Sequence, residues 1–362
     1  MDILFSPLRI GSLLVPNRFV RSATHDFMAD DEGHVTDSHV KLYSRLAEGE
    51  VGLIVTGHAH VQPSGQASPR QMAVHDDRFI GGLARIPEAV HRFASRVVLQ
   101  IAHAGRQTKE KLCGCVPVSP SAVHDPASKV MPRELSSDEI RSLVDDFVAA
   151  GLRARRAGFD GLQLHAAHGY LLSSFLSPHT NRRRDEWGGP VENRARALVE
   201  ILRGLRSALG RDYPVIVKLN STDFLEGGLT LEDAVRIAVL IESEGIDGIE
   251  VSGGMAEAGR GSVWPGLRTE DEEGYFAENA ARIKQAVQVP VFALGGIRTL
   301  AVAGRIVREG RADLVSLSRP LIRDPFLVRR FREGSAARSE CTSCNKCFNP
   351  RGIRCAELAE GR

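Results

Sequence analysis

The chain has 362 residues, of which 43% are hydrophobic and 25% are charged, so it is long enough to bury a substantial core. Its formal net charge of +2 gives no electrostatic footprint for nucleic acid or for a membrane surface. No apolar run approaches the roughly 20 residues that cross a bilayer, and no signal peptide is recognisable, so we expect a cytoplasmic protein without membrane contact.

The first predicted element is a hairpin at residues 8–16, with Gly11 and Ser12 as its turn, lying across the floor of the fold. Apolar or β-branched runs then recur along the chain as candidate parallel strands. These runs occupy residues 18–23, 51–57, 97–102, 159–165, 214–219, 246–252, 289–295 and 312–318.

Helical patterns separate the predicted strands, with apolar residues three and four positions apart. The clearest of these patterns occupy residues 137–157, 191–209, 231–244 and 275–287. Ser136 and Thr230 are placed to cap helix starts, and Gly158 and Gly245 follow helices directly, as C-terminal stops do.

Eight strand–helix repeats in a chain of this length predict an α/β fold, a closed (β/α)8 TIM barrel. We expect the barrel to occupy residues 1–335 and a short Cys-rich tail to occupy residues 336–362. An open doubly wound sheet is the main competitor, but no GxGxxG motif opens the first strand–helix turn.

A cluster of functional side chains, His165-Ala166-Ala167-His168-Gly169-Tyr170, follows the fourth predicted strand, at the end where parallel α/β folds place ligand sites. His165 and His168 can each donate a hydrogen bond to one bound group, and Tyr170 can reach the same group with a phenolic proton. Such a site holds a carbonyl or carboxylate oxygen and protonates a neighbouring carbon. A metal pair or two core histidines are the alternatives, but neither accounts for Tyr170.

Glycines, polar residues and one alanine stand at the ends of the other predicted strands. They are Ser22, Ala23, Thr24, His25, Gly57, Gln100, Lys218, Ser252, Gly295, Gly296, Ser318 and Arg319. Gly295, Gly296 and Arg319 suit a phosphate, because the loops after strands seven and eight commonly bind one in barrels. Gln100, His165 and Lys218 suit the polar edge of a flat heterocycle, and a lysine there would stabilise negative charge during reduction.

The chain resembles the Old Yellow Enzyme family of FMN-containing barrels over essentially residues 1–335. The resemblance rests on motifs at residues 4–8, 16–18, 100–106, 165–170, 175–178, 181–183, 185–189 and 192–194. It implies FMN, contacted by Ala23, Gly57, Gln100, Lys218, Gly296 and Arg319. It also implies reduction of an activated C=C bond in a small-molecule alkene: His165 and His168 hold the activating oxygen, hydride passes from flavin N5 to the β carbon, and Tyr170 gives the proton.

Two positions depart from this family pattern. His25 stands where many members have cysteine, which is similar to the arrangement in bacterial 2,4-dienoyl-CoA reductases. Lys218 stands where many have arginine, and a lysine is a point charge without a planar fork. We therefore expect charge compensation to survive at Lys218, with a different flavin potential.

The tail contains Cys341, Cys344 and Cys347 in a C-x2-C-x2-C pattern, with Cys355 after seven more residues. This spacing is typical of an iron–sulfur site, and the first three cysteines are similar to the pattern in trimethylamine dehydrogenase. The gap to the fourth cysteine is longer in such relatives. A [4Fe–4S] cluster, a zinc ion and a reduced tail without metal all remain open.

Together these features predict an enzyme, an FMN-dependent ene-reductase that uses NAD(P)H as co-substrate. One alternative is an oxidative flavin dehydrogenase that passes electrons through the cluster to an electron-transfer protein, and another is a non-catalytic flavin redox module. The long segments 104–134 and 254–273 interrupt the strand–helix rhythm and are expected to be lids or binding loops. We also expect a homo-oligomer.

Overall fold

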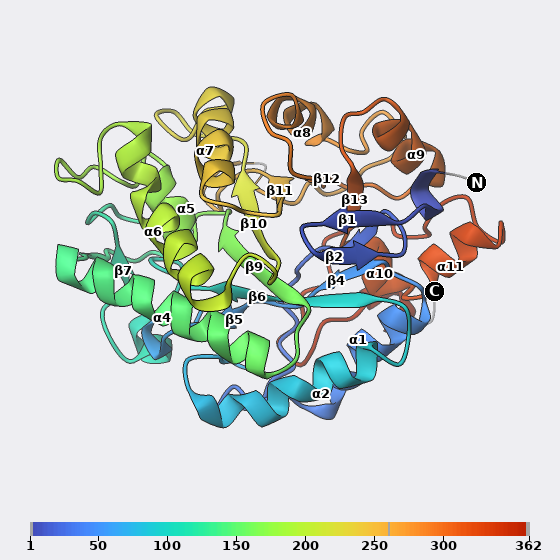
Figure 1. Cartoon of the computed structure of the whole chain (residues 1–362), viewed down its shortest axis with the longest axis horizontal. Helices are drawn as coiled ribbons and strands as arrows, with labels where there is room; N and C mark the ends of the chain where they lie inside the picture. The colour runs from blue at the N-terminus through green and yellow to red at the C-terminus, as the bar shows by residue number, and fades with distance from the viewer. Residues whose placement is uncertain (1–2, 260, 360–362) are drawn as a thin grey trace.

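A computed structural model describes residues 3–259 and 261–359 as a closed barrel of parallel strands with helices on its outside (Figure 1). In chain order the barrel strands are β3 (Phe19–Arg21), β4 (Leu53–Val55), β6 (Arg96–Ala102), β9 (Gly161–Ala166), β10 (Val215–Asn220), β11 (Gly248–Ser252), β12 (Val291–Ala293) and β13 (Leu314–Leu317). Strand β3 closes the barrel because it pairs in parallel with both β13 and β4. The predicted (β/α)8 barrel is therefore confirmed, and every strand lies within one residue of its predicted run.

The helices between the strands are amphipathic and pack around the barrel. They are α1 (Asp37–Glu48), α2 (Ile80–Val90), α4 (Ser137–Arg156), α6 (Val191–Leu209), α7 (Leu231–Ser243), α8 (Ala277–Lys284) and α9 (Leu300–Arg308). The Ser136 hydroxyl accepts from the Glu139 backbone N–H, and the Glu139 carboxylate accepts from the Ser136 N–H, so a capping box starts α4. Gly158, which lies just after α4, has a φ of +87°. This is the left-handed backbone conformation that glycine tolerates best and that commonly ends a helix.

Shorter elements complete the described fold and lie mainly in the connections at the active face and after β13. They are β5 (Ala59–His60), α3 (Glu110–Cys113), β7 (Val118–Ser119), β8 (Arg133–Glu134), α5 (Leu171–Leu176), α10 (Arg319–Arg323), α11 (Leu327–Arg332) and α12 (Ala356–Ala359), with 3-10 turns at Ile3–Phe5, Pro63–Gly65 and Asp77–Phe79. None of the helices in the described part of the chain combines the length and the apolar character needed to cross a bilayer.

The predicted hairpin is present as β1 (Leu8–Ile10) paired antiparallel with β2 (Leu13–Val15). Its buried side chains pack in one cluster with apolar side chains from the barrel strands: Val20, Leu53, Val55, Val98, Ile216, Phe292 and Leu314. The hairpin therefore covers the floor of the barrel (Figure 1), as predicted.

The barrel strands change from apolar to polar two residues beyond this floor cluster. Gln100 lies two residues after Val98, and Lys218 lies two residues after Ile216. Residues two positions apart on a strand point to the same face of the sheet. The interior thus has an apolar layer above the hairpin and a polar layer at the carboxyl ends of the strands. That polar layer is where the candidate site lies.

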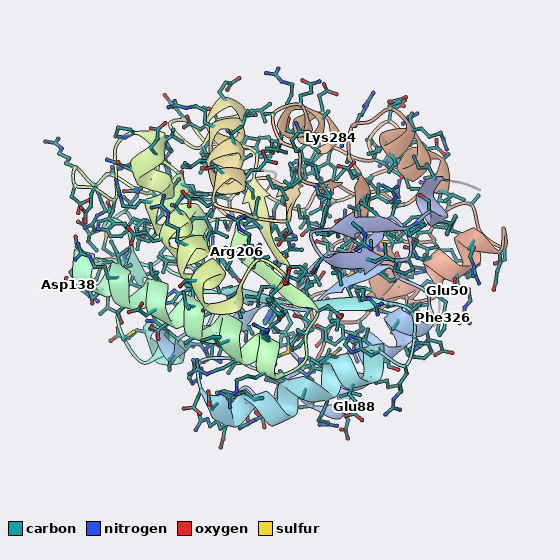
Figure 2. The ribbon with its side chains drawn as sticks, in the orientation of Figure 1. Glu50, Glu88, Asp138, Arg206, Lys284 and Phe326 are labelled. Carbon is teal, nitrogen blue, oxygen red and sulfur yellow. The ribbon has the colours of Figure 1, made fainter. Side chains whose placement is uncertain are left out.

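Ion pairs from the outer helices anchor the segments that lead into two strands (Figure 2 labels Arg206 and Lys284). Arg206 of α6 pairs with Asp247, just before β11, and Lys284 of α8 lies 2.6 Å from Asp313, just before β13. Each carboxylate also accepts a backbone N–H from a neighbouring strand segment. These contacts set the height of the strands in the barrel and hence the positions of the side chains at their ends.

Candidate active site

A cavity of about 270 Å³ opens at the carboxyl ends of the barrel strands. Most of the residues predicted from the sequence line it: Ser22, Ala23, Thr24, His25, Gln100, His165, His168, Tyr170, Lys218, Gly296, Ser318 and Arg319. The structure thus brings together side chains from the first, third, fourth, fifth, seventh and eighth strand–helix units of the barrel.

Gly57, Ser252 and Gly295 were also predicted to contact the cofactor but lie beside the cavity. The Gly57 N–H donates to the Tyr43 hydroxyl at 2.8 Å, and the Ser252 hydroxyl lies 2.7 Å from His168 Nε2. The Gly295 carbonyl accepts from the backbone N–H of Tyr275. Ser252 is therefore placed to orient His168, which is a role the sequence did not suggest.

Several cavity residues were missed by the sequence analysis, among them His58, Gln107, Tyr275 and Phe348. His58 directly follows Gly57, so the end of the second predicted strand was the signal that could have found it. Phe348 comes from the tail, and no local pattern indicates that the tail returns to the barrel.

A layer of buried polar side chains lies beneath the cavity and forms its floor, and Ser22, Gln100 and Lys218 of this layer line the cavity itself. Gln100 Nε2 donates to Gln163 at 2.6 Å, and Gln163 Nε2 donates to Glu250 at 3.0 Å. Lys218 Nζ donates to Ser22 at 2.8 Å. Because each side chain holds the next, the donors that face the cavity keep fixed positions.

Lys218 and Glu250 form the charged part of this floor and lie 3.4 Å apart. Burial raises the pKa of the Glu250 carboxyl, but the Lys218 ammonium and several hydrogen bonds outweigh this, so its pKa lies below the ordinary value. Glu250 is thus a carboxylate at neutral pH, and the cavity floor carries an ion pair where the sequence predicted a lone cation.

His165, His168 and Tyr170 converge on one wall of the cavity. The rings of His165 and His168 have centroids 5.3 Å apart, and those of His165 and Tyr170 4.7 Å apart. Burial, followed by the charges of His168, His58 and Lys218, holds the pKa of His165 well below its ordinary value. Burial and then Lys218 lower the pKa of His168 to about 3.

Both imidazoles are therefore neutral near pH 7, and each has one N–H to donate. His165 Nδ1 is buried and has no hydrogen-bond partner among the residues that the structure describes. Because buried polar atoms normally have a hydrogen-bond partner, a polar group bound in the cavity would lie within hydrogen-bond distance of this nitrogen. Burial also raises the pKa of the Tyr170 phenol, so this group keeps its proton.

His25 lies at the same side of the cavity and packs against other rings. It stacks on His58 at a centroid distance of 4.7 Å and meets Phe27 edge-on at 3.8 Å. Burial is the main cause that lowers the pKa of His25 to about 4. The histidine that departs from the family pattern is thus neutral, and its Nε2 forms a hydrogen bond with Ser68.

The end of the cavity away from His165, His168 and Tyr170 suits a phosphate. Gly296 has a φ of +70°, a conformation that favours glycine, and a Cβ atom there would meet Leu267 Cδ1 at 2.2 Å and Tyr275 Cε1 at 2.9 Å. Arg319 is 6% exposed, and its Nη1 donates to the carbonyls of Trp264 and Ser343 and to Asn345 Oδ1. These residues, with the unpaired His165 nitrogen at the other end, fit a flat ring with a phosphate-bearing chain such as FMN.

The two long segments predicted as lids meet over the active face. Arg106 and Glu257 form a buried ion pair between them, with side chains 1% and 6% exposed. Ala256, Ser262 and Val263 from the second segment line the cavity. The two segments are thus linked to each other, and both contribute residues to the cavity lining, while their role as lids or binding loops stays a prediction.

The four tail cysteines lie beside the phosphate end, and all are free thiols. Burial and then Cys341, Cys344 and Cys355 raise the pKa of Cys347 to about 11, so all three thiols are near enough to Cys347 to affect its charge. Among the described residues, however, no three His, Cys, Asp or Glu side chains are arranged to hold a metal ion.

The loop between these cysteines has an unusual backbone. Ser343 and Asn345 have φ values of +58° and +59°, a conformation that asparagine tolerates but that costs a residue such as serine about 1–2 kcal/mol. Arg319 offsets this cost through its bonds to both residues. Arg319 therefore links the phosphate end of the cavity to the cysteine loop.

Comparison with known proteins identifies the family. The family described as NADH:flavin oxidoreductase / NADH oxidase matches residues 3–338. The chain is 39% identical to an NADH oxidase of Thermoanaerobacter brockii over 94% of its own length and 52% of that protein. It is 35% identical to an NADPH dehydrogenase of Bacillus subtilis, covering 90% of this chain and 93% of that one.

Solved structures agree with this result. A 2-naphthoyl-CoA reductase in complex with 2-naphthoyl-CoA superposes with a TM-score of 0.91 at 31% identity, covering 96% of this chain and 54% of that chain. An old yellow enzyme homologue from Zymomonas mobilis superposes with a TM-score of 0.81 at 28% identity, covering 93% and 94%. The chain thus spans about half the length of some relatives and nearly all of others.

Proposed function

The chain belongs to the NADH:flavin oxidoreductase / NADH oxidase family, and from this premise we propose that it is an FMN-dependent ene-reductase that uses NAD(P)H. The observation that carries the proposal is the convergence of His165, His168 and Tyr170 on one wall of the cavity. The family implies a flavoprotein oxidoreductase, and this constellation adds a place for a carbonyl oxygen and a proton donor beside it.

FMN would be held by residues at both ends of the cavity. Arg319 and the backbone at Gly296 would take the phosphate, and Gln100 and Lys218 would meet the polar edge of the ring. When bound, FMN supplies the hydride that reduces the β carbon of the alkene.

The protein contributes orientation and a proton. His165 and His168 would donate hydrogen bonds to the carbonyl oxygen of an activated alkene, which polarises the C=C bond. Ser252, 2.7 Å from His168 Nε2, keeps that ring in position. Tyr170, whose raised pKa keeps it protonated, would deliver its proton to the α carbon.

Two half-reactions test this proposal. Anaerobic addition of NADH or NADPH to the purified holoprotein should bleach the flavin absorbance, and 2-cyclohexenone should then restore it with formation of cyclohexanone. Bleaching without reoxidation by any of a panel of enones, enals and enoyl thioesters would contradict the ene-reductase proposal.

A second candidate function is oxidative, with electrons leaving through a [4Fe–4S] cluster on Cys341, Cys344, Cys347 and Cys355 to an electron-transfer protein. The supporting observation is that the four thiols are neighbours on a loop that Arg319 connects to the cavity. Four thiolates are the ligands that such a cluster requires, but no three of the described side chains are arranged to hold a metal ion, so the cysteine loop would have to rearrange to bind it. Iron and acid-labile sulfide in anaerobically purified protein would separate this candidate from the plain reductase.

A further inference from the structure

We propose that His58 is a positioning residue for Tyr170: it donates a hydrogen bond from Nε2 to the phenolic oxygen, directs the phenolic proton away from itself into the cavity, and stabilises the phenolate left after proton delivery. This inference rests on the proposed function, in which Tyr170 is the proton donor. It concerns a residue that no pattern in the sequence singled out.

The two side chains meet inside the cavity, although they lie 112 residues apart in the chain. His58 follows the end of β4 and is 6% exposed. Its Nε2 lies 3.3 Å from the Tyr170 hydroxyl oxygen, and the two rings are nearly perpendicular, at 76°. Either group could donate in this pair, so the direction of the hydrogen bond depends on which His58 nitrogen carries the proton.

Gln71 decides the position of that proton. Its Oε1 accepts from the backbone N–H of Ala67 at 2.7 Å, and its Nε2 donates to the His58 carbonyl at 3.2 Å. If the Gln71 amide were flipped, its oxygen would face the His58 carbonyl oxygen and its NH2 group would face the Ala67 N–H. These two backbone groups therefore determine the orientation of the amide. The same Nε2 lies 2.7 Å from His58 Nδ1, which must therefore accept.

His58 carries a single ring proton. Burial, and then the neighbouring His25, hold the pKa of His58 well below its ordinary value, while Asp26 opposes this. The two imidazoles stack in nearly parallel planes, 11° apart, with centroids 4.7 Å apart, so positive charges on both rings at once would repel. A neutral His58 with Nδ1 as acceptor has its proton on Nε2, which points at Tyr170.

The phenolic oxygen of Tyr170 is thus an acceptor toward His58, and its own proton cannot point there. During turnover the Tyr170 O–H bond breaks and a C–H bond forms at the α carbon, while the electron pair comes from the nicotinamide coenzyme through the bound flavin. Water then returns a proton to Tyr170. The hydrogen bond from His58 strengthens once the oxygen is charged, so His58 lowers the barrier without touching the substrate.

A double-mutant cycle tests the role in the holoenzyme. His58→Leu should slow reoxidation of the reduced flavin by 2-cyclohexenone about 10- to 100-fold when Tyr170 is present, the effect of losing a hydrogen bond to a charged group. In the Tyr170→Phe background the same change should alter the rate less than about 2-fold. Equal slowing in both backgrounds, or none with Tyr170 present, would overturn the proposal.

Two further variants show whether the effect belongs to the donor. His58→Gln should recover most of the rate, because its amide reaches about as far as the imidazole Nε2. His60→Gln is the matched control: His60 is also buried with a lowered pKa, but its Nδ1 bonds to the Gln62 carbonyl. This control should leave the rate unchanged, and a His58→Gln variant as slow as His58→Leu would contradict the assignment.

A measurement without turnover tests the hydrogen-bond direction. In holoprotein labelled with 15N-histidine, the His58 signals, identified by their loss in His58→Gln, should show a neutral ring protonated at Nε2. A ring protonated at Nδ1, or an imidazolium, would overturn the proposal. If no enone reoxidises the unmodified protein, the proposed function fails while this spectrum still decides the direction.

Discussion

Lys218 and Glu250 face each other in register on strands β10 and β11, with the ammonium 3.4 Å from the carboxylate. Their side chains are 3% and 0% exposed, so solvent screens this pair little. Lys218 is also in register with His165 on β9. One cross-strand row therefore contains the buried carboxylate, the cation and the first histidine of the candidate site.

Glu250→Gln should raise the midpoint potential of the bound flavin. The change removes the charge that compensates Lys218, so the cation is free to stabilise negative charge on the reduced ring. Removing one partner of a buried pair should also cost about 3–5 kcal/mol of stability. Dye-coupled reduction and thermal unfolding measure the two effects, and Glu244→Gln in the surface pair with Arg203 is the control. A lower or unchanged potential would count against this role.

Tyr170→Phe should leave FMN binding and reduction by the nicotinamide coenzyme intact. Reoxidation of the flavin by an enone should slow by roughly 10²- to 10⁴-fold, the contribution of a general acid. Stopped-flow absorbance separates the two half-reactions. Tyr213→Phe, a buried tyrosine outside the cavity, is the matched control. An unchanged oxidative half-reaction in Tyr170→Phe would remove this residue from the mechanism.

His165→Ala and His168→Ala should each weaken binding of phenol by about 1.5–3 kcal/mol, because each removes a donor to the partly anionic oxygen of the bound ligand. The lowered pKa values keep both imidazoles neutral, His168 down to about pH 3. Phenol affinity should therefore show no histidine titration between about pH 5.5 and 8, a range around the ordinary histidine pKa. A step near pH 6.5 in a spectroscopic titration would contradict the neutral pair.

Arg319→Ala should raise the fraction of purified protein that lacks FMN, because it removes a charge-assisted bond to the phosphate. Affinity for riboflavin, which has no phosphate, should change little. Arg323→Ala is the control, since Arg323 also contacts the tail, through Glu357 at 2.7 Å, but does not line the cavity. If the affinities for FMN and riboflavin fell equally, Arg319 would stabilise the fold and would not bind the phosphate.

If the second candidate function holds, anaerobically purified protein should contain about four iron and four sulfide per chain, and Cys344→Ala should abolish both while FMN stays bound. The expected loss follows from removing one of four ligands on a loop whose backbone at Ser343 is already strained. Cys113→Ala, a free cysteine on a separate segment, is the control and should keep the iron. Protein that contains zinc, or four freely titratable tail thiols, is the contrary result.

The sequence by itself determined the order and bounds of the barrel strands, because an apolar run bounded by turn residues is a local pattern. It also determined which residues reach the cavity from strand ends, such as Gln100, Lys218 and Arg319. In a parallel barrel all carboxyl ends meet at one face, so residues far apart in the chain can be grouped without any knowledge of their contacts.

Only the tertiary structure decided the partners of these residues. Glu250 lies against Lys218, Gln71 contacts Nδ1 of His58, and the tail returns to Arg319 through Ser343 and Asn345. Each of these pairings joins segments that are distant in sequence. Each also depends on the directions in which side chains point and on interatomic distances of a few ångströms. Periodicity reports which face of an element is buried, but the electrostatics of a buried group depend on the particular atom that lies against it.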